Sequence, residues 1–278
     1  MAINWYPGHM VKAKREIQEN LKLVDIVAVL LDARAPFSCR NTDLEKMCRH
    51  KQILFTLTKM DLASPEGTRA YLARLRAEGA TAVAIDSTSG KGLAEVIQAI
   101  KSIYQPQAEE MINRGRRIRP ARVMVVGVPN IGKSTFLNCL VGKKMAHTGA
   151  KPGITRGKQW VRVREDIELM DTPGLMRPKV QGEEQGLKLA LLNIVGEKAY
   201  QEHEVALYLL RTLQIKAPAL LAEKLKVSNP TIGAEELLEE IALKRGHLLK
   251  AGALDLGKTC TSLLLDFRKG RLGLISLD

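Results

Sequence analysis

The sequence lacks the marks of membrane, secreted and zinc proteins. No apolar run approaches the roughly 20 residues that a membrane-spanning helix needs. The first residues, MAINWYPGHM, have neither the charged nor the apolar region of a secretory signal. The cysteines contain no C-x-x-C pair, which disfavours a zinc site and a disulfide framework; they are Cys39, Cys48, Cys139 and Cys260. We therefore expect a cytoplasmic protein without a membrane partner.

An even charge balance is also missing. The 278 residues are 45% hydrophobic, enough for two domains with proper cores, and carry a net charge of +13. Residues 1–178 hold 29 Lys and Arg against 17 Asp and Glu, whereas residues 179–278 hold 14 against 13. This excess favours a polyanionic partner such as RNA, although a generally basic soluble surface explains the charge alone equally well.

Hydrophobic patterning predicts an α/β domain over residues 1–178 and an all-α domain over residues 179–278. Short apolar runs typical of buried strands alternate with helical patterns, which favours a mostly parallel six-stranded sheet with helices on both faces. The expected strands are residues 26–31, 53–57, 81–85, 122–126, 158–164 and 167–170. A basic helix over residues 10–23 precedes them, and helical patterns recur almost without strand signals after residue 183.

The strand at residues 122–126 leads into the phosphate-binding pattern G-x-x-x-x-G-K-[ST] at residues 127–134. A strand, glycine loop and helix in this order aim backbone N–H groups and the positive helix end at a polyphosphate. We expect Lys133 to reach the β- and γ-phosphates and the Ser134 hydroxyl to bind Mg²⁺. The neighbouring nucleotide-binding residues are Asn130, Ile131, Gly132 and Thr135.

Downstream, D-x-x-G at residues 171–174 follows the last predicted strand. Asp171 is expected to organise Mg²⁺ through water, and the backbone N–H of Gly174 to contact the γ-phosphate. D-x-x-G alone is a weak signal of a nucleotide site, but D-x-x-G at this distance after a phosphate loop is a specific one.

A base-selecting motif precedes the phosphate loop. Thr58-Lys59-Met60-Asp61 resembles N-K-x-D, in which a carboxylate accepts from both guanine donors and a lysine stem lies along the base. Thr58 replaces the usual asparagine. Ser87 follows the next strand, in a loop expected to present backbone N–H groups to the guanine O6.

The order of these motifs is unusual, because the guanine motifs precede the phosphate loop. The same sheet results if the original ends of a GTPase domain are joined and the chain is cut elsewhere. Residues 105–121 are the expected joining segment, a connecting helix and linker. We therefore predict a circularly permuted P-loop GTPase domain.

This order, with WYPGHM at the start, DARAP after the first strand and GVPNIGKST in the middle, closely resembles the YlqF/RbgA family of permuted GTPases. The resemblance covers essentially the whole chain. It implies a GTPase that assists late assembly of the large ribosomal subunit, with the subunit precursor, its rRNA and ribosomal proteins as partners. DNA is not expected as a partner, and the chain is expected to be monomeric.

The resemblance also implies roles for individual residues. Thr155 corresponds to the switch threonine that binds Mg²⁺, and Asn130 to an asparagine that coordinates K⁺, although Asn130 also suits a turn after Pro129. Leu175 stands where many GTPases have a water-orienting glutamine, so basal hydrolysis should be slow. His9 is then a candidate for orienting or deprotonating the water, the alternative being a helix N-terminal or RNA-facing histidine.

The predicted function is GTP hydrolysis coupled to binding and release of the precursor large subunit. His9, Lys133, Thr155 and Gly174 are the candidate catalytic residues, with GTP as substrate, Mg²⁺ as cofactor and K⁺ as a second candidate cation. The alternative is a nucleotide-gated RNA- or ribosome-binding scaffold with negligible hydrolysis, which Leu175 favours. A GTPase of tRNA modification or membrane traffic is a third class, and no cofactor or lipidation motif supports it.

Overall fold

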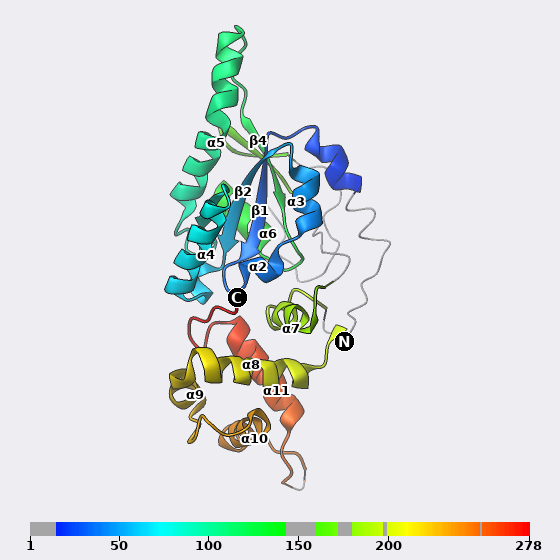
Figure 1. The fold of residues 1–278 in the computed structure, drawn as a ribbon, viewed down its shortest axis with the longest axis vertical. Helices are drawn as coiled ribbons and strands as arrows, with labels where there is room; N and C mark the ends of the chain where they lie inside the picture. Colours follow the sequence, from blue (N-terminus) through cyan, green and yellow to red (C-terminus); the bar gives the residue numbers. More distant parts are fainter. Residues whose placement is uncertain (1–14, 143–159, 172–179, 197–198, 251) are drawn as a thin grey trace. The chain divides into compact units, whose positions relative to one another are not determined.

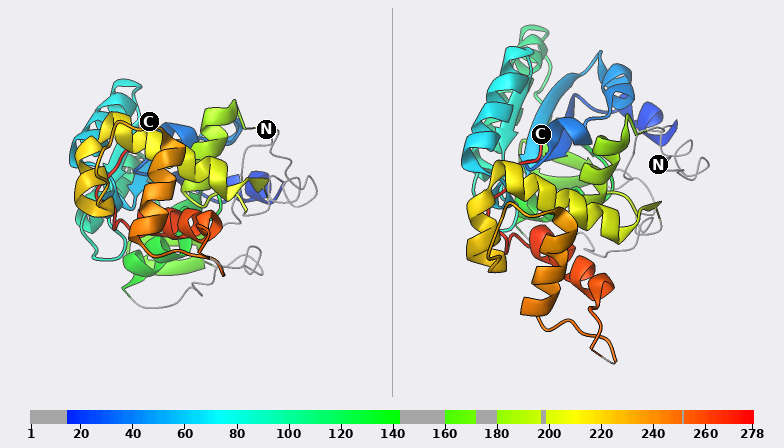
Figure 2. Two further views of the ribbon diagram at one scale, coloured as in Figure 1. Left: turned by 90° about the horizontal axis from the view of Figure 1, so that it is seen from below. Right: turned by 60° about the horizontal axis from the view of Figure 1, so that its bottom comes forward.

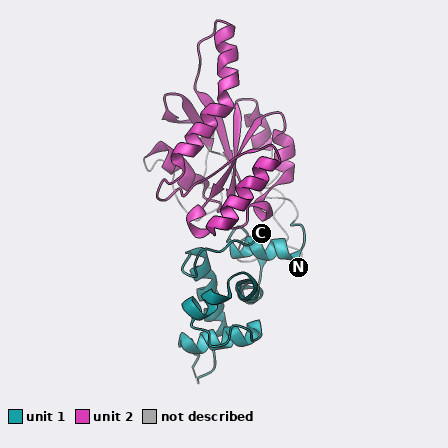
Figure 3. Ribbon diagram, turned by 60° about the vertical axis from the view of Figure 1, so that its left-hand side comes forward, with its two compact units in different colours: residues 1–4, 179–277 teal, residues 5–178, 278 magenta. Residues whose placement is uncertain are grey.

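A computed structural model gives the fold and describes residues 15–142, 160–171, 180–196, 199–250 and 252–278. The chain divides into two compact units (Figure 3). Of the described residues, those up to residue 171 and Asp278 form one unit, and those from residue 180 to residue 277 form the other. His9, Thr155, Gly174 and Leu175 lie outside the described residues, as does the side chain of Asp171.

Within the described residues, the first unit is built on one six-stranded sheet (Figure 1). The strands are β1 Ile26–Asp32, β2 Gln52–Thr58, β3 Thr81–Ala84, β4 Ala121–Val126, β5 Trp160–Arg164 and β6 Ile167–Asp171. Their order across the sheet is β3-β2-β1-β4-β6-β5, and only the β5–β6 pairing is antiparallel. The predicted mostly parallel sheet is confirmed.

The central strands are apolar because both of their faces are covered. All seven residues of β1 are buried, and so are the last four of β4. Helices lie on both faces of the sheet (Figures 1 and 2). They are α2 Pro36–Cys39, α3 Thr42–Cys48, α4 Pro65–Ala77, α5 Leu93–Asn113 and α6 Lys133–Val141, and residues 15–21 are helical as well.

Side-chain caps begin two of these helices. The Asn41 side chain accepts from the Leu44 N–H at the start of α3, and Ser64 accepts from the Gly67 N–H at the start of α4. Pro36 and Pro65 occupy first-turn positions, where the missing N–H has no helical partner to lose. A proline after a strand usually marks the end of regular structure, but here the short helix α2 begins at Pro36.

Helix α5 is longer than predicted. A separate connecting helix and linker was expected over residues 105–121, but α5 runs without a break from Leu93 to Asn113 with Pro106 inside it. A proline removes one backbone donor and crowds the preceding turn. Side-chain contacts on both sides of the proline hold the helix in place: Tyr104 donates to the Arg119 carbonyl oxygen at 3.0 Å, and Gln107 donates to Asp25 at 2.9 Å.

The second unit contains α7 Glu183–Leu191, α8 Glu202–Lys216, α9 Pro218–Leu225, α10 Ala234–Lys244 and α11 Leu256–Arg268. Helix α8 packs against the other four, and its apolar side is buried with Leu238 and Leu264 of α10 and α11. Among the described residues, no single helix is long and apolar enough to cross a membrane. The bent pair α8–α9 has the length and composition, but many of its apolar residues form this core.

Candidate nucleotide site

The phosphate-binding pattern forms a loop between β4 and α6. Asn130 and Gly132 both have positive φ, at 56° and 102°, so the chain turns sharply before α6 begins. A Cβ on Gly127 would lie 3.0 Å from the Leu30 carbonyl oxygen, which leaves little room for any other residue there. The first turn of α6 follows this loop directly, and a helix N-terminus at the end of a glycine loop favours an anion.

Lys133 and Ser134 start α6. The Nζ of Lys133 lies 3.2 Å from the Val128 carbonyl oxygen and 3.4 Å from that of Gly127, so the lysine lies across the loop. The Ser134 side chain, in the same first turn, is partly exposed. Its hydroxyl is an oxygen ligand of the kind that Mg²⁺ prefers. Within the described residues, no group of three or more His, Cys, Asp or Glu is placed to hold a metal ion.

The guanine-type motif lies at the end of β2, two strands away from β4 across β1. The Thr58 hydroxyl is buried and lies 2.9 Å from the Ile131 carbonyl oxygen and 3.1 Å from that of Leu31. It can donate only one proton, which the two carbonyls must share. An asparagine, with two N–H donors, would satisfy both, so the threonine keeps the link to the phosphate loop in a weaker form.

Lys59 follows in a left-handed conformation, with φ of 56°. Its ammonium donates to the Asn130 carbonyl oxygen at 3.0 Å, so the lysine crosses from β2 to the phosphate loop. Its Cε also lies 3.9 Å from where a Cβ on Gly132 would be. Asn130 is thus a turn residue whose carbonyl oxygen also anchors Lys59. This contact neither supports nor excludes the predicted binding of K⁺ by Asn130.

Lys59 has a second partner that sequence reasoning missed. Its Nζ lies 3.1 Å from Oδ2 of Asp32, the last residue of β1. Asp32 is fully buried, and burial alone would raise its pKa. The charges of Lys59 and Arg34 and the hydrogen bonds from Arg34 outweigh burial, and the pKa of Asp32 lies below its ordinary value. The sequence pattern did not reveal this contact, because it depends on the parallel register that pairs Asp32 with Thr58.

Asp61 lies in the 3₁₀ turn η1 Met60–Leu62. Burial, followed by the nearby Asp86 carboxylate, raises the pKa of Asp61 above its ordinary value. Such a shift is typical of a carboxylate that a ligand with N–H donors would stabilise in its charged form.

The loop after β3 is shaped by Asp86. Its carboxylate accepts from the Thr88 N–H at 2.8 Å and from the Ser89 hydroxyl. Ser87 lies between Asp86 and Thr88 in the chain. Its hydroxyl is buried and has no hydrogen-bond partner in the described structure. A buried hydroxyl without a partner is costly, so a polar ligand group at this position would relieve the cost.

The loop is also held close to β3 by Gly92, the residue before α5. Gly92 has φ of 91°, and a Cβ there would lie 2.2 Å from the Ala84 carbonyl oxygen. Strands β1, β2, β3 and β4 are parallel, so their carboxyl ends lie at one edge of the sheet. The guanine-type motif, the Ser87 loop and the phosphate loop all follow these ends, which is where α/β sheets bind ligands.

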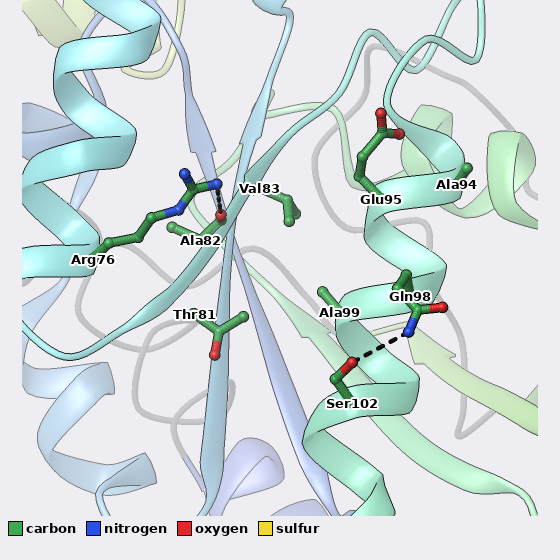
Figure 4. Close-up of a pocket in the computed structure, with 9 residues that line it drawn as sticks. All are labelled: Arg76, Thr81, Ala82, Val83, Ala94, Glu95, Gln98, Ala99 and Ser102. Carbon is green, nitrogen blue, oxygen red and sulfur yellow. Dashed lines mark hydrogen bonds between the residues drawn. The ribbon is translucent and has the colours of Figure 1, made fainter.

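A shallow groove elsewhere on the unit carries none of these motifs. It lies at the edge strand β3, between α4 and α5 (Figure 4). Arg76 donates to the Ala82 carbonyl oxygen at 3.0 Å and so covers part of the open strand edge. Gln98 donates to Ser102 at 3.4 Å along the α5 side. Because its lining contains no phosphate-loop or guanine-motif residue, we do not assign the groove to the nucleotide.

Comparison with known proteins agrees with this geometry. Residues 122–236 match the family model described as "50S ribosome-binding GTPase". Ribosome biogenesis GTPase A of Bacillus cereus is 36% identical over 278 residues, covering 100% of this chain and 94% of that protein. The Bacillus pumilus protein of the same name is 37% identical, with 100% and 99% covered. Mitochondrial ribosome-associated GTPase 1 of Xenopus tropicalis is 32% identical, with 99% and 94% covered.

The fold agrees as well. The crystal structure of GNP-bound YlqF from T. maritima superposes with a TM-score of 0.66 at 25% identity, covering 96% of this chain and 97% of that one. The similarity thus extends over the sheet-containing unit and the helical unit, and it includes the permuted motif order that the sequence predicted. The chain therefore belongs to the ribosome biogenesis GTPase A family and is a GTP-hydrolysing enzyme with a role in ribosome assembly.

Proposed function

We propose that this GTPase binds the precursor of the large ribosomal subunit through its rRNA, hydrolyses GTP there and leaves upon hydrolysis. The observation that carries the proposal is the full-length similarity to proteins named ribosome biogenesis GTPase A, over a chain whose phosphate loop and guanine-type motif meet at one edge of the sheet. Ribosomal proteins are further candidate partners.

At the nucleotide, each side chain has a role that its position supports. The first turn of α6 and Lys133 hold the phosphates, with Ile131, Gly132 and Thr135 contributing backbone contacts. Asp61 accepts from the guanine N1–H and exocyclic amine, the Lys59 stem lies along the base, and Ser87 faces the base from the next loop. Mg²⁺ supplies positive charge at the phosphate oxygens when bound, with the Ser134 hydroxyl as its protein ligand in the described structure.

The remaining catalytic groups come from the sequence. Thr155 and Asp171 complete the Mg²⁺ surroundings, Gly174 contacts the γ-phosphate, and His9 orients or deprotonates the attacking water. Asn130 is the proposed K⁺ ligand. Leu175 cannot orient water, because its side chain has no hydrogen-bonding group, so we propose that hydrolysis is slow until the ribosomal particle places His9.

For the rRNA contact we propose the α5 tip, which comprises residues 112–118. Helix α5 projects well beyond the sheet before the chain returns to β4 (Figure 1). Arg116 and Arg117 are exposed and make no ion pair or side-chain hydrogen bond with the described part of the chain. Ile112 and Ile118 beside them are 56% and 54% exposed. Guanidinium groups suit phosphate oxygens, and exposed apolar side chains suit unstacked bases.

The base of the α5 tip is held firmly. Arg119 makes two hydrogen bonds of 2.7 Å to the carboxylate of Asp25, which is also bonded by the Arg122 N–H at 2.9 Å. Asp25 directly precedes β1, so these hydrogen bonds attach the base of the α5 tip to a central strand of the sheet. A preorganised tip loses less conformational entropy when it docks on RNA.

Sedimentation with large ribosomal particles tests the RNA contact. We expect Arg116→Ala with Arg117→Ala to weaken binding in the GTP form and to reduce the salt dependence of log K by about two, one for each lost phosphate contact. Arg162→Ala with Arg164→Ala is the matched control, because these exposed arginines lie on the edge strand β5 of the same sheet. Equal binding and salt slope in the two double variants would contradict the assignment of the tip.

A nucleotide-gated scaffold with negligible hydrolysis is the second candidate, and Leu175 is the residue that favours it. Measuring GTP turnover with and without large ribosomal particles, in K⁺ and in Na⁺, separates the two functions. We expect turnover to rise with particles and to be higher in K⁺. Turnover that stays at the basal rate under all four conditions would favour the scaffold.

A further inference from the structure

The DARAP segment after β1 contains an ion cluster that none of the assigned roles uses. Arg34 forms a two-pronged pair with Asp32: its Nε lies 2.9 Å from Oδ1 and its Nη2 lies 2.8 Å from Oδ2. The Arg34 backbone N–H adds a third bond to Oδ1 at 3.1 Å. Asp32 is 0% exposed and Arg34 is 2% exposed, so the pair is withdrawn from water.

A buried ion pair by itself is weak evidence for stability. Removing two charges from water carries a large desolvation penalty, and apolar side chains of similar volume are often at least as stabilising. The pair is therefore better explained by what else the carboxylate does. Its Oδ2 also accepts the Lys59 ammonium at 3.1 Å, so one buried carboxylate holds two cations.

Lys59 connects the cluster to the nucleotide site. Its ammonium contacts Asp32 on one side and the Asn130 carbonyl oxygen of the phosphate loop on the other. The side chain is 26% exposed, and the residue has a left-handed backbone conformation, with φ of 56°. A long flexible side chain loses considerable rotamer entropy when held in one place, so a fixed charge partner is needed to keep it there.

The position of β1 in the sheet explains why Asp32 lies near both Lys59 and the phosphate loop. Strand β1 lies between β2, which carries Lys59, and β4, which leads into the phosphate loop. Asp32 is opposite Thr58 in the parallel register, while Val29 of β1 is opposite Val126, the last residue of β4. Among the strands that the structure describes, β1 is thus the one whose end is adjacent to both parts of the nucleotide site.

We propose that Asp32, oriented by Arg34, is a positioning residue that holds the Lys59 ammonium against the phosphate-loop carbonyl and so keeps the guanine contacts and the phosphate loop in register. The proposal rests on the proposed nucleotide role of Lys59. Asp32 does not touch the nucleotide and acts on the base and loop, not on the γ-phosphate. Its loss should weaken GDP and GTP binding equally, and turnover at saturating GTP should change little.

Titration of the full chain with a fluorescent GDP and a fluorescent non-hydrolysable GTP analogue tests this. Asp32→Asn keeps the shape of the side chain and removes its charge. We expect both nucleotides to bind roughly 10- to 100-fold more weakly, as for the loss of one coupled charged contact. Wild-type affinity in a folded Asp32→Asn protein would overturn the proposal, and so would a loss restricted to the GTP analogue.

Asp32→Asn leaves the Arg34 charge buried without its carboxylate, so this variant also loses stability. A second variant separates the loss of stability from the loss of nucleotide affinity. Asp32→Asn with Arg34→Met removes both buried charges, and we expect it to regain thermal stability while nucleotide affinity stays low. Recovery of affinity together with stability would show that the pair is only structural and would overturn the positioning role.

A double-mutant cycle separates this proposal from the assignment of the guanine site. We expect Lys59→Met to weaken GDP binding, and Asp32→Asn to add no further loss in the Lys59→Met background, because the carboxylate acts through Lys59. Additive losses would overturn the positioning role alone. An unchanged affinity in Lys59→Met would instead overturn the nucleotide role of Lys59, on which the proposal rests.

Discussion

Thr58 and Ile131 are separated by 73 residues, yet the Thr58 hydroxyl lies 2.9 Å from the Ile131 carbonyl oxygen. Thr58 ends β2, and Ile131 belongs to the phosphate loop after β4. This hydrogen bond and the one from Lys59 to Asn130 both join the guanine-type motif to the phosphate loop. It also shows that a threonine can maintain the link to the phosphate loop at a position where the motif usually has asparagine.

Removing the Thr58 hydroxyl should therefore weaken both the fold and the nucleotide site. Thr58→Val keeps the shape and leaves the carbonyls of Ile131 and Leu31 without this donor, so we expect a loss of about 1–3 kcal/mol in the free energy of unfolding. GDP affinity should fall as well. Thr58→Ser retains the hydroxyl and serves as the control; equal GDP affinity in the two variants would contradict the link.

The raised pKa of Asp61 predicts a pH dependence of nucleotide binding. Burial, and after it the Asp86 carboxylate, favours the protonated form of the free protein, whereas guanine N–H donors need the ionised form. Affinity for GDP should be full at neutral pH and fall as the pH drops through the pKa of Asp61, above the range of an ordinary aspartate near ~3.9. Titrations from pH 7.5 down through ~3.9, the ordinary aspartate value, with Asp61→Asn as a control that lacks the titrating carboxyl, measure this. Affinity that is constant across the range would contradict the assigned contact.

Gly92 should be intolerant of a side chain for steric reasons. Alanine there would combine a φ of 91° with a Cβ 2.2 Å from the Ala84 carbonyl oxygen, whereas at Gly79 it would meet only the unfavourable φ of 79°. We expect Gly79→Ala to cost about 1–2 kcal/mol of unfolding free energy and Gly92→Ala clearly more. Chemical denaturation of both variants compares the costs. If Gly92→Ala lost less unfolding free energy than Gly79→Ala, the Ser87 loop would not lie as close to β3 as described.

His9 should act on hydrolysis and not on nucleotide binding. His9→Ala is expected to leave GDP affinity unchanged and to reduce particle-stimulated GTP turnover by roughly 100-fold or more, the usual contribution of a general base. Single-turnover hydrolysis with excess large subunits measures the chemical step. If the variant keeps full stimulated turnover, His9 has no catalytic role and its structural or RNA-facing alternative is favoured.

The sequence alone predicted much of this architecture, and the physical reasons are visible. Strands such as β1 and β4 are continuous apolar runs because both faces of a parallel sheet are covered, and that pattern is easy to recognise. The phosphate loop was predictable because its glycines meet local backbone needs, such as the φ of 102° at Gly132. These signals are contained within a few neighbouring residues.

What was missed depends on contacts between distant segments. The length of α5 was underestimated because Pro106 indicates a helix end, while the contacts that offset it come from Arg119 and Asp25. The role of Asp32 was missed because it depends on strand register, which places the end of β1 beside Thr58. Composition and periodicity along one segment contain no information about such pairings.

The most direct test of the account is sedimentation of the full chain with large ribosomal subunits in the presence of GDP, GTP or a non-hydrolysable GTP analogue. We expect strong binding with the analogue, weak binding with GDP, and release when bound GTP is hydrolysed. Equal binding in the analogue and GDP forms would contradict it, because GTP hydrolysis could not then drive departure from the particle.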